Sequence, residues 1–167
     1  DLPDSGAGLI IVGSHVPRTT EQMNALLAHP QISQTEVRVD ALLHEAHRTN
    51  DINRAAELSD KALARGRDMV IYTGRQLVSG KTTESSLSIG QKISKGLIAI
   101  LNKITVKPRY ILAKGGITSS DVATKGLKVK RAIVIGQILP GVPVWSLGEE
   151  SRWPGMAYIV FPGNVGV

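Results

Sequence analysis

The segment at residues 110–121, YILAKGGITSSD, combines residue types that commonly bind phosphate. A short apolar run leads into Gly115 and Gly116, and the hydroxyl residues Thr118 and Ser119 follow. Glycine adopts backbone angles that are closed to other residues, and Thr118 or Ser119 can cap a following helix. The free N–H groups and the partial positive charge of a helix start favour an anion. These residues predict a phosphate loop; the alternative is an ordinary connection from strand to helix.

Two other loops with glycine follow apolar runs. The run GLIIVG at residues 8–13 leads to Ser14, and the run AYIVF at residues 157–161 leads to Pro162 and Gly163. Ligands of open α/β sheets gather at the carboxyl ends of the strands. Three such loops, each after an apolar strand, favour a nucleotide-binding crevice at that edge of the sheet.

A GKT triplet in TGRQLVSGKTT, residues 73–83, invites comparison with a P-loop, but its spacing does not match. Five residues separate Gly74 from Gly80, whereas the motif requires four. The extra residue would misplace the amides that wrap the phosphates. We expect a long loop here, from which Arg75 or Lys81 could reach a phosphate.

Other catalytic chemistries have little support in the sequence. The GxGxxG fingerprint of nicotinamide dehydrogenases is missing, and Ser14 lacks the glycine that a hydrolase nucleophile elbow needs two residues later. His44 and His47 stand three residues apart with no third metal ligand nearby, so we expect surface histidines and no metal site. His15 is a better functional candidate, but no partner acid or base can be named. The catalytic residues are therefore left unidentified.

The elements that must position these loops alternate between apolar strands and amphipathic helices. Strands are expected at residues 8–13, 35–39, 69–73, 110–113, 132–135, 142–146 and 157–161, and helices at about 20–28, 41–65, 87–104 and 117–127. A break in the second helix is expected near Thr49 and Asn50, with Asp51 restarting it. The alternation predicts a three-layer, Rossmann-like α/β domain with a largely parallel or mixed central sheet. We expect residues 1–7 to be a linker and residues 8–167 to be a single domain.

Composition adds three expectations about the whole chain. At 167 residues and 42% hydrophobic, it is long enough to form one full core. It has no cysteine, which excludes disulfides and cysteine nucleophiles. It has neither an apolar run long enough to span a membrane nor a signal peptide, so we expect a soluble, cytoplasmic protein.

The net charge of +6 suits an anionic partner such as a nucleotide, a sugar phosphate or a nucleic acid. Most of the excess lies between residues 102 and 131, so we expect it to surround the predicted phosphate loop. A nucleic-acid surface usually interleaves stacking aromatic residues with its cations, and this stretch contains only Tyr110. The composition therefore favours a small phosphorylated ligand.

Four blocks of the sequence resemble the carboxyl-terminal nucleotide-binding domain of the four-carbon acid sugar kinases, which phosphorylate threonate, erythronate and related acids with ATP. The blocks are LIIVGSHVPRTTEQM at 9–23, YILAKGGITSSDVATKGL at 110–127, GQILPGVPVW at 136–145 and FPGNVG at 161–166. The resemblance implies that Ser14 contacts the nucleotide and that Gly163 closes its pocket. It also implies that the ATP phosphates bind to Gly115, Gly116, Ile117 and Thr118.

The same resemblance bears on the metal and on the rest of the enzyme. Magnesium would enter with ATP, but many family members carry an acid where this chain has Ile117 and a serine where it has Pro162. A metal contact from that acid would be absent here or moved to Asp121. The acid-sugar site would lie on an N-terminal domain that is absent from this chain, so the isolated domain would have no kinase activity.

Two alternatives from other functional classes remain open at this point. One is a non-catalytic nucleotide- or anion-binding regulatory module, which the departure at Ile117 supports. The other is a basic nucleic-acid-binding domain. The sequence also leaves open whether the chain forms a homo-oligomer.

Overall fold

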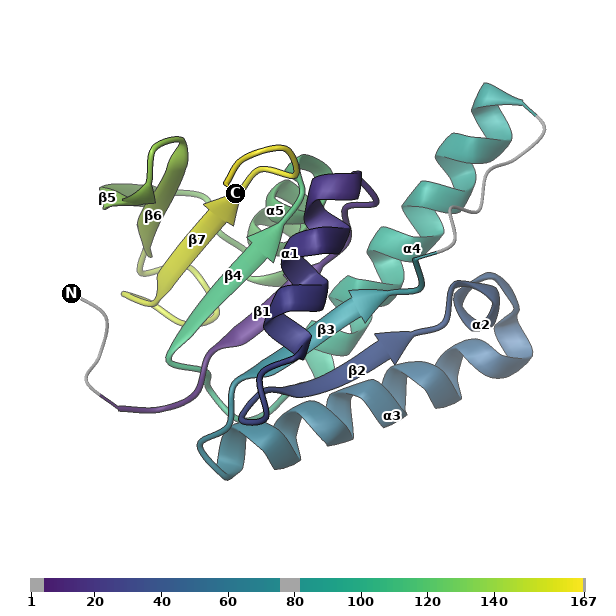
Figure 1. Cartoon of the computed structure of the whole chain (residues 1–167), viewed down its shortest axis with the longest axis horizontal. Coiled ribbons are helices and arrows are strands. Elements are labelled where there is room, and N and C mark those ends of the chain that lie inside the picture. The colour runs from purple at the N-terminus through teal and green to yellow at the C-terminus, as the bar shows by residue number, and fades with distance from the viewer. Residues whose placement is uncertain (1–4, 76–81, 167) are drawn as a thin grey trace.

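A computed structural model describes residues 5–75 and 82–166 of the chain (Figure 1). In chain order its elements are β1 (Leu9–Val12), α1 (Pro17–Leu27), β2 (Ser33–Val37), α2 (Val39–Leu43), α3 (Glu45–Ala64), β3 (Met69–Thr73), α4 (Thr83–Lys103), β4 (Tyr110–Lys114), α5 (Gly116–Asp121), the π-helical turn η1 (Val122–Gly126), β5 (Ala132–Leu139), β6 (Val142–Leu147) and β7 (Ala157–Phe161). None of the described helices is long and apolar enough to cross a membrane.

The strands form one seven-stranded sheet in the order β2-β3-β1-β4-β7-β6-β5. The five strands from β2 to β7 are parallel, and β6 and β5 add antiparallel neighbours at one side. The central strands are continuous apolar runs because both of their faces are covered, as in β1, where all four residues are buried. The predicted α/β fold with a largely parallel, mixed sheet is confirmed.

Helices cover both faces of the parallel part of the sheet (Figure 1). On one face Leu9 and Ile11 of β1 join the main core with residues of α3, α4 and η1. On the other face Ile10 and Val12 pack with Met23 of α1 in a smaller core. Because alternate residues of β1 pack against helices on opposite faces, the sheet lies between two helical layers.

The predicted break near Thr49 and Asn50 is wrong, because the helix is interrupted earlier, at His44 between α2 and α3. Asp51 lies within α3 and is buried. Its carboxylate accepts a 3.0 Å hydrogen bond from the backbone N–H of Arg38 and forms a 2.8 Å ion pair with Arg54. Asp51 thus ties α3 to the segment after β2 and does not start a helix.

Candidate functional site

The loops after β1, β4 and β7 meet because these three strands are neighbours and run in the same direction. Ser14 lies at their centre. A Cβ atom built on Gly115 would lie 3.0 Å from Ser14 Cβ, and one built on Gly163 would lie 2.7 Å from Ser14 Oγ. Only residues without side chains can approach Ser14 this closely. The structure therefore brings together Ser14, Gly115 and Gly163, which the sequence placed in three separate loops.

Gly115 is the residue that turns the chain from β4 into α5. Its φ of 115° lies in the region that favours glycine, and it occupies the N-cap position of α5. The expectation that Thr118 or Ser119 caps this helix is wrong, since both lie inside α5. Ser119 instead donates a 2.7 Å hydrogen bond from its hydroxyl to the carbonyl oxygen of Ala113.

Thr118 packs the loop after β4, the predicted phosphate loop, against the loop after β1. A Cβ atom built on Gly13 would lie 2.1 Å from Thr118 Oγ1, so the Thr118 side chain rests directly on the Gly13 backbone. Glycine at position 13 is therefore required by packing against a residue more than one hundred positions away in the sequence.

The beginning of α5 presents a row of backbone N–H groups. The first hydrogen bond of the helix runs from Ser119 N to Gly115 O at 2.8 Å, so the N–H groups of residues 116–118 have no partner within the helix. A Cβ atom built on Gly116 would meet no atom within 4 Å beyond its chain neighbours and its own helix backbone, and 78% of the Ile117 surface is exposed. A ligand can therefore reach these N–H groups. Because α5 continues directly into η1, the helical dipole also points its positive end toward this opening.

The third loop is held by two residues that sequence analysis did not place in the site. Lys114 is buried, donates a 2.9 Å hydrogen bond to the carbonyl oxygen of Pro162 and lies 3.9 Å from the centre of the Phe161 ring. Thr19 Oγ1 donates to Gly163 O at 2.9 Å and lies 3.2 Å from Ser14 Oγ. A lysine at the end of a buried strand, directly before paired glycines, was the available signal for Lys114.

The electrostatics of Lys114 follow from this environment. Burial, together with the nearby positive charge of Arg18, lowers the pKa of Lys114 to about 8. Part of the Lys114 population is therefore neutral near physiological pH. An anion bound close to its ammonium group would restore the charged form.

A fourth loop, after β3, also contacts the first loop. His15 Nε2 lies 2.9 Å from the carbonyl oxygen of Gly74, and Arg75 donates a 2.6 Å hydrogen bond to Thr20 Oγ1. Two other guanidinium nitrogens of Arg75, Nε and Nη1, are buried and have no hydrogen-bond partner among the described residues. Burial lowers the pKa of Arg75. An oxyanion would satisfy these donors, so Arg75 remains a candidate phosphate ligand; Lys81 lies outside the described residues.

Asp121 does not fit the role of a magnesium ligand. One of its carboxylate oxygens lies 2.7 Å from Lys125 Nζ, and the other accepts a hydrogen bond from the hydroxyl of Ser94. Partial burial raises the pKa of Asp121, but these two hydrogen bonds outweigh it and hold the pKa below its ordinary value. The carboxylate is therefore already satisfied by its neighbours on α4 and η1.

Other metal sites are equally unsupported in the part of the chain that the structure describes. No group of three or more His, Asp or Glu residues is arranged to hold a metal ion there. His44 and His47 are exposed on the surface, as the sequence predicted.

The expected concentration of positive charge around the predicted phosphate loop is wrong for four of the eight cations between residues 102 and 131. Lys107 and Arg109 precede β4, and Lys130 and Arg131 precede β5, which runs in the same direction as β4. These four cations therefore lie toward the amino ends of the strands, away from the loops. The cations beside the loops are instead Lys114, Arg18 and Arg75, which hydrogen-bond Pro162, Gly166 and Thr20, respectively.

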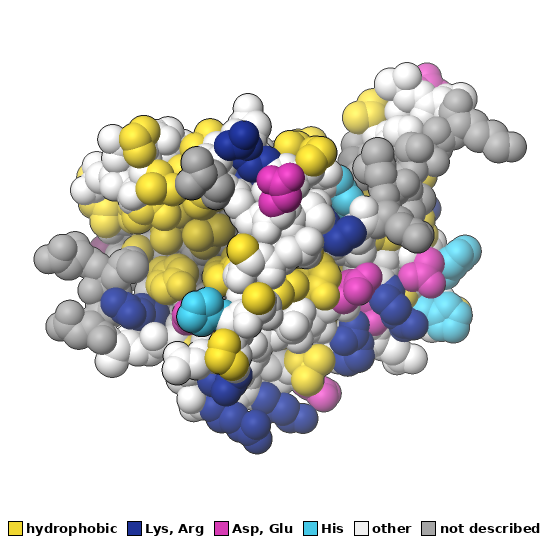
Figure 2. Space-filling model, viewed as in Figure 1, with side chains coloured by type: hydrophobic (Ala, Val, Ile, Leu, Met, Phe, Trp, Pro, Cys, Tyr) yellow, Lys and Arg dark blue, Asp and Glu magenta, His cyan; other side chains and the backbone are white. Residues whose placement is uncertain are grey.

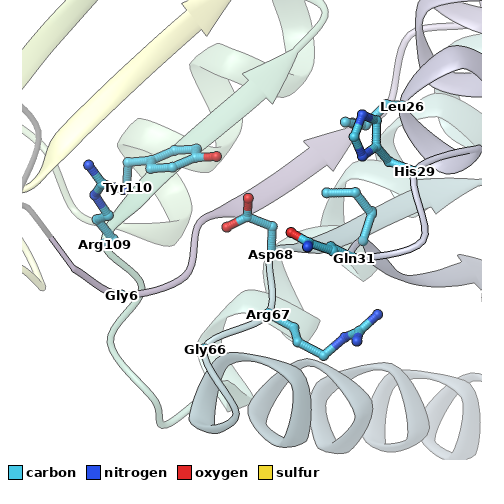
Figure 3. A pocket seen from close by; sticks show the side chains of 10 residues that line it. Gly6, Leu26, His29, Gln31, Gly66, Arg67, Asp68, Arg109 and Tyr110 are labelled. Atoms are coloured by element: carbon cyan, nitrogen blue, oxygen red, sulfur yellow. The ribbon is translucent and has the colours of Figure 1, made fainter.

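A cavity of about 660 Å³ lies at the amino ends of the strands, opposite the glycine loops (Figure 3). Two of its charged residues already join neighbouring loops, whereas Arg109 Nε is buried without a hydrogen-bond partner among the described residues. Asp68 accepts a 2.6 Å hydrogen bond from Gly8 N, and Arg67 donates at 2.8 Å to Pro30 O. Because these bonds hold the chain together, this cavity is a weaker candidate site than the loops around Ser14.

Comparison with known proteins agrees with this geometry. Residues 9–167 match the family described as the nucleotide-binding C-terminal domain. No curated protein matches the chain.

Solved structures of low sequence identity share the fold. A Salmonella typhimurium LT2 protein named as a tRNA synthase candidate is 18% identical, with a TM-score of 0.76 over 99% of this chain and 39% of its own. A Bordetella bronchiseptica protein with a domain of unknown function (DUF1537), described as a domain-swapped dimer with bound citrate, is 14% identical, with a TM-score of 0.77 over 97% of this chain and 38% of its own. A second crystal form of that protein gives 16% identity and a TM-score of 0.68. The chain thus spans well under half the length of these proteins.

Proposed function

The chain belongs to the nucleotide-binding C-terminal domain family, and we propose that it is the ATP-binding part of a kinase that phosphorylates a four-carbon sugar acid of the threonate or erythronate class. The observation that carries this proposal is the meeting of three loops around Ser14, beside the open row of N–H groups at residues 116–118. The resemblance to the four-carbon acid sugar kinases supplies the substrate class.

The phosphates of ATP would bind at the beginning of α5. The N–H groups of Gly116, Ile117 and Thr118 would donate to phosphate oxygens, and Ser14 would contact the nucleotide from its place against Gly115, directly before them. Gly163 would close the pocket from the third loop, and Arg75 would satisfy its two buried nitrogens with a phosphate oxygen. The N–H groups and the Arg75 guanidinium would stabilise negative charge, which is the main requirement of phosphoryl transfer.

Magnesium would be carried by the nucleotide, since Asp121 is already paired and the described residues contain no cluster of three or more His, Asp or Glu that could hold a metal. Bound to ATP, the ion neutralises charge on the phosphates. The remaining parts of the reaction would come from an N-terminal domain that holds the acid sugar and supplies the catalytic base. Closure of the two domains would bring the γ-phosphate to the acceptor hydroxyl and exclude water.

The proposal is tested by calorimetric titration of magnesium–ATP into the wild-type chain and two valine variants. Gly116→Val places a side chain in the open space where the phosphates would bind, and no atom beyond its chain neighbours and its own helix backbone lies within 4 Å to oppose it. We expect ATP affinity to fall by more than about tenfold. Gly90→Val is the matched control, because Gly90 is also an exposed helical glycine with open space around its Cβ position, and it lies on α4. Equal affinity for ATP in the wild type and Gly116→Val would contradict the proposal.

A non-catalytic anion-binding module is the second candidate, and the pairing of Asp121 with Lys125 and Ser94 is what favours it. Such a module would bind ATP without turnover even when joined to its N-terminal domain. A nucleic-acid-binding domain has less support, because the cations before β4 and β5 lie away from the glycine loops. Strongly salt-dependent binding to polynucleotides, with no affinity for ATP, would identify that third function.

A further inference from the structure

The strand at one edge of the sheet, β5, has an unusual surface. All eight of its residues are exposed, although its sequence, AIVIGQIL, contains no charged residue. The exposed fractions of its large apolar side chains run from 44% to 70%, and these residues are Ile133, Val134, Ile135, Ile138 and Leu139. Since successive residues of a strand point to opposite faces, both faces of β5 are apolar and exposed.

The outer edge of β5 is open as well. Among residues 5–75 and 82–166, only β6 pairs with β5, so its outer N–H and C=O groups face no other strand. Proteins usually protect such edges with charges, proline, very short strands or β-bulges. β5 is long and uncharged, and its irregularities are the positive φ of Gly136 and the register shifts between Val134 and Gly136 and between Gln137 and Leu139.

The apolar surface continues beyond the strand. Leu139 also lines a mostly apolar groove of about 450 Å³, which Met23 of α1 and Phe161 of β7 border on other sides. Figure 2 shows hydrophobic side chains gathered on this side of the molecule, over the β5–β6 hairpin and β7. Contiguous exposed apolar surface of this kind marks an interface.

We propose that β5 pairs with β5 of a second copy of this chain, antiparallel and about a two-fold axis near the middle of the strand. A strand is the partner that can satisfy the open row of backbone groups. A second copy supplies a strand that is also uncharged, and a two-fold axis lets one surface bind itself without leaving an open edge. The two sheets would then form one continuous sheet across the dimer.

The distribution of charge selects the antiparallel direction. Lys128, Lys130 and Arg131 precede β5, whereas Pro140 and Gly141, which follow it, carry no charge. Parallel pairing would set the two cationic ends about 5 Å apart, whereas antiparallel pairing separates them by about 25 Å, well beyond the screening length of about 8–10 Å. Glu150 accepts hydrogen bonds from Lys130 N and Arg131 N and offsets only part of this positive charge.

The first test is the molecular mass of the chain in solution, measured by analytical ultracentrifugation over a range of concentrations. We expect the mass to rise from 17.9 kDa toward twice that value in the wild type. Ile135→Lys should remain monomeric, because it places a charge at the centre of the interface. Leu87→Lys is the matched control, since Leu87 is 62% exposed and lies on α4, away from β5. This variant should dimerise like the wild type.

Circular dichroism of Ile135→Lys should match the wild type, because the Ile135 side chain is half exposed in the monomer. A wild-type chain that stays at 17.9 kDa at every concentration overturns the proposal, and means that another domain or protein covers β5. Dimerisation of Ile135→Lys with wild-type strength overturns it as well.

The second test fixes the direction of pairing and uses the absence of native cysteine. In an antiparallel dimer, cysteines replacing Ile135 lie about 6 Å apart across the axis, so a short bis-maleimide should join the two copies. Cysteines replacing Ala132 lie more than about 20 Å apart and should not be joined. Combining Ala132→Cys with Leu139→Cys should restore cross-linking. Efficient cross-linking of Ala132→Cys alone would indicate parallel pairing and overturn the proposal.

Discussion

At the scale of single residues, the candidate site depends on side chains that are missing as much as on those that are present. Gly115 and Gly163 let the backbone approach Ser14, and Gly116 leaves an opening above the first N–H groups of α5. Lys114 then joins the second loop to the third through Pro162. The site is therefore a backbone surface whose geometry is set by a few buried polar contacts.

Lys114 makes the stability of the domain depend on pH. Its pKa is lowered from 10.5 to about 8 in the folded chain, so the unfolded chain binds more protons between these two values. Stability should therefore rise as the pH increases from 8 to 10.5, and the cost of burying the charged Lys114 is fully present below about pH 8. Replacing Lys114 with methionine removes the titration but keeps an apolar side chain over Phe161.

The measurement is urea unfolding of wild type and Lys114→Met at pH 7, 8.5 and 10. We expect the unfolding free energy of the wild type to rise relative to that of Lys114→Met as the pH increases. At the higher pH Lys114 becomes neutral, so the wild type no longer buries a charged ammonium group. A difference that stays constant over this range would show that Lys114 titrates at its ordinary pKa.

Ile117 offers a test of how the domain handles magnesium. The side chain is 78% exposed and lies in the first turn of α5, where an acid suits the helix dipole and disturbs no packing. In Ile117→Asp, the new carboxylate should repel ATP when magnesium is removed with a chelator, and should tolerate magnesium–ATP. Ile117→Asn is the control of equal shape and no charge. Titrations in which both variants respond equally to magnesium would place the phosphates away from this turn.

At the scale of elements, the site depends on the register between β1 and β4. The contact of Thr118 with Gly13 joins the loops after these strands, and Tyr158 of β7 donates a 2.6 Å hydrogen bond to Ser119 O from below. Burial raises the pKa of Tyr158, so its hydroxyl remains a donor at physiological pH. The beginning of α5 is thus supported from both neighbouring strands.

Gly13→Ala tests this support. The new methyl group would lie 2.1 Å from Thr118 Oγ1, so one loop must shift, and we expect a loss of about 1–3 kcal/mol of stability together with weaker ATP binding. Adding Thr118→Ala removes that atom and leaves Thr118 Cβ at 3.2 Å, so the double variant should regain part of the loss. Chemical unfolding of the four proteins in this cycle gives the coupling energy, and additive effects would contradict a direct contact.

The elements also show how far sequence analysis reaches. The expected strand at residues 157–161 coincides with β7, and the three loops meet as expected, because buried parallel strands carry a strong apolar signal. The helix break was misplaced because the carboxylate of Asp51 is used by Arg38 and Arg54, a tertiary contact that local patterns do not reveal. Lys114 was missed for a related reason: its burial depends on β7 and α1, which are distant in the sequence.

At the scale of the whole molecule, the carboxyl and amino ends of the parallel strands differ in chemistry. The glycine loops and the open beginning of α5 lie at the carboxyl ends of the strands, whereas the cations before β4 and β5 lie toward the amino ends. The chain spans only 38–39% of the two proteins of the same fold with TM-scores above 0.75. Under the proposed function, a second domain would close over the loops that meet at the carboxyl ends of the strands and would contribute the acceptor.

This arrangement predicts that nucleotide binding and catalysis can be separated. The isolated chain should bind magnesium–ATP but produce no ADP with four-carbon sugar acids, because it positions only one of the two reactants. Joined to an N-terminal acid-sugar domain, the wild type and Gly90→Val should produce ADP in a coupled assay, whereas Gly116→Val should not. Turnover by the isolated chain would contradict the divided site. Turnover by the two-domain Gly116→Val variant at the wild-type rate would instead contradict phosphate binding at the beginning of α5.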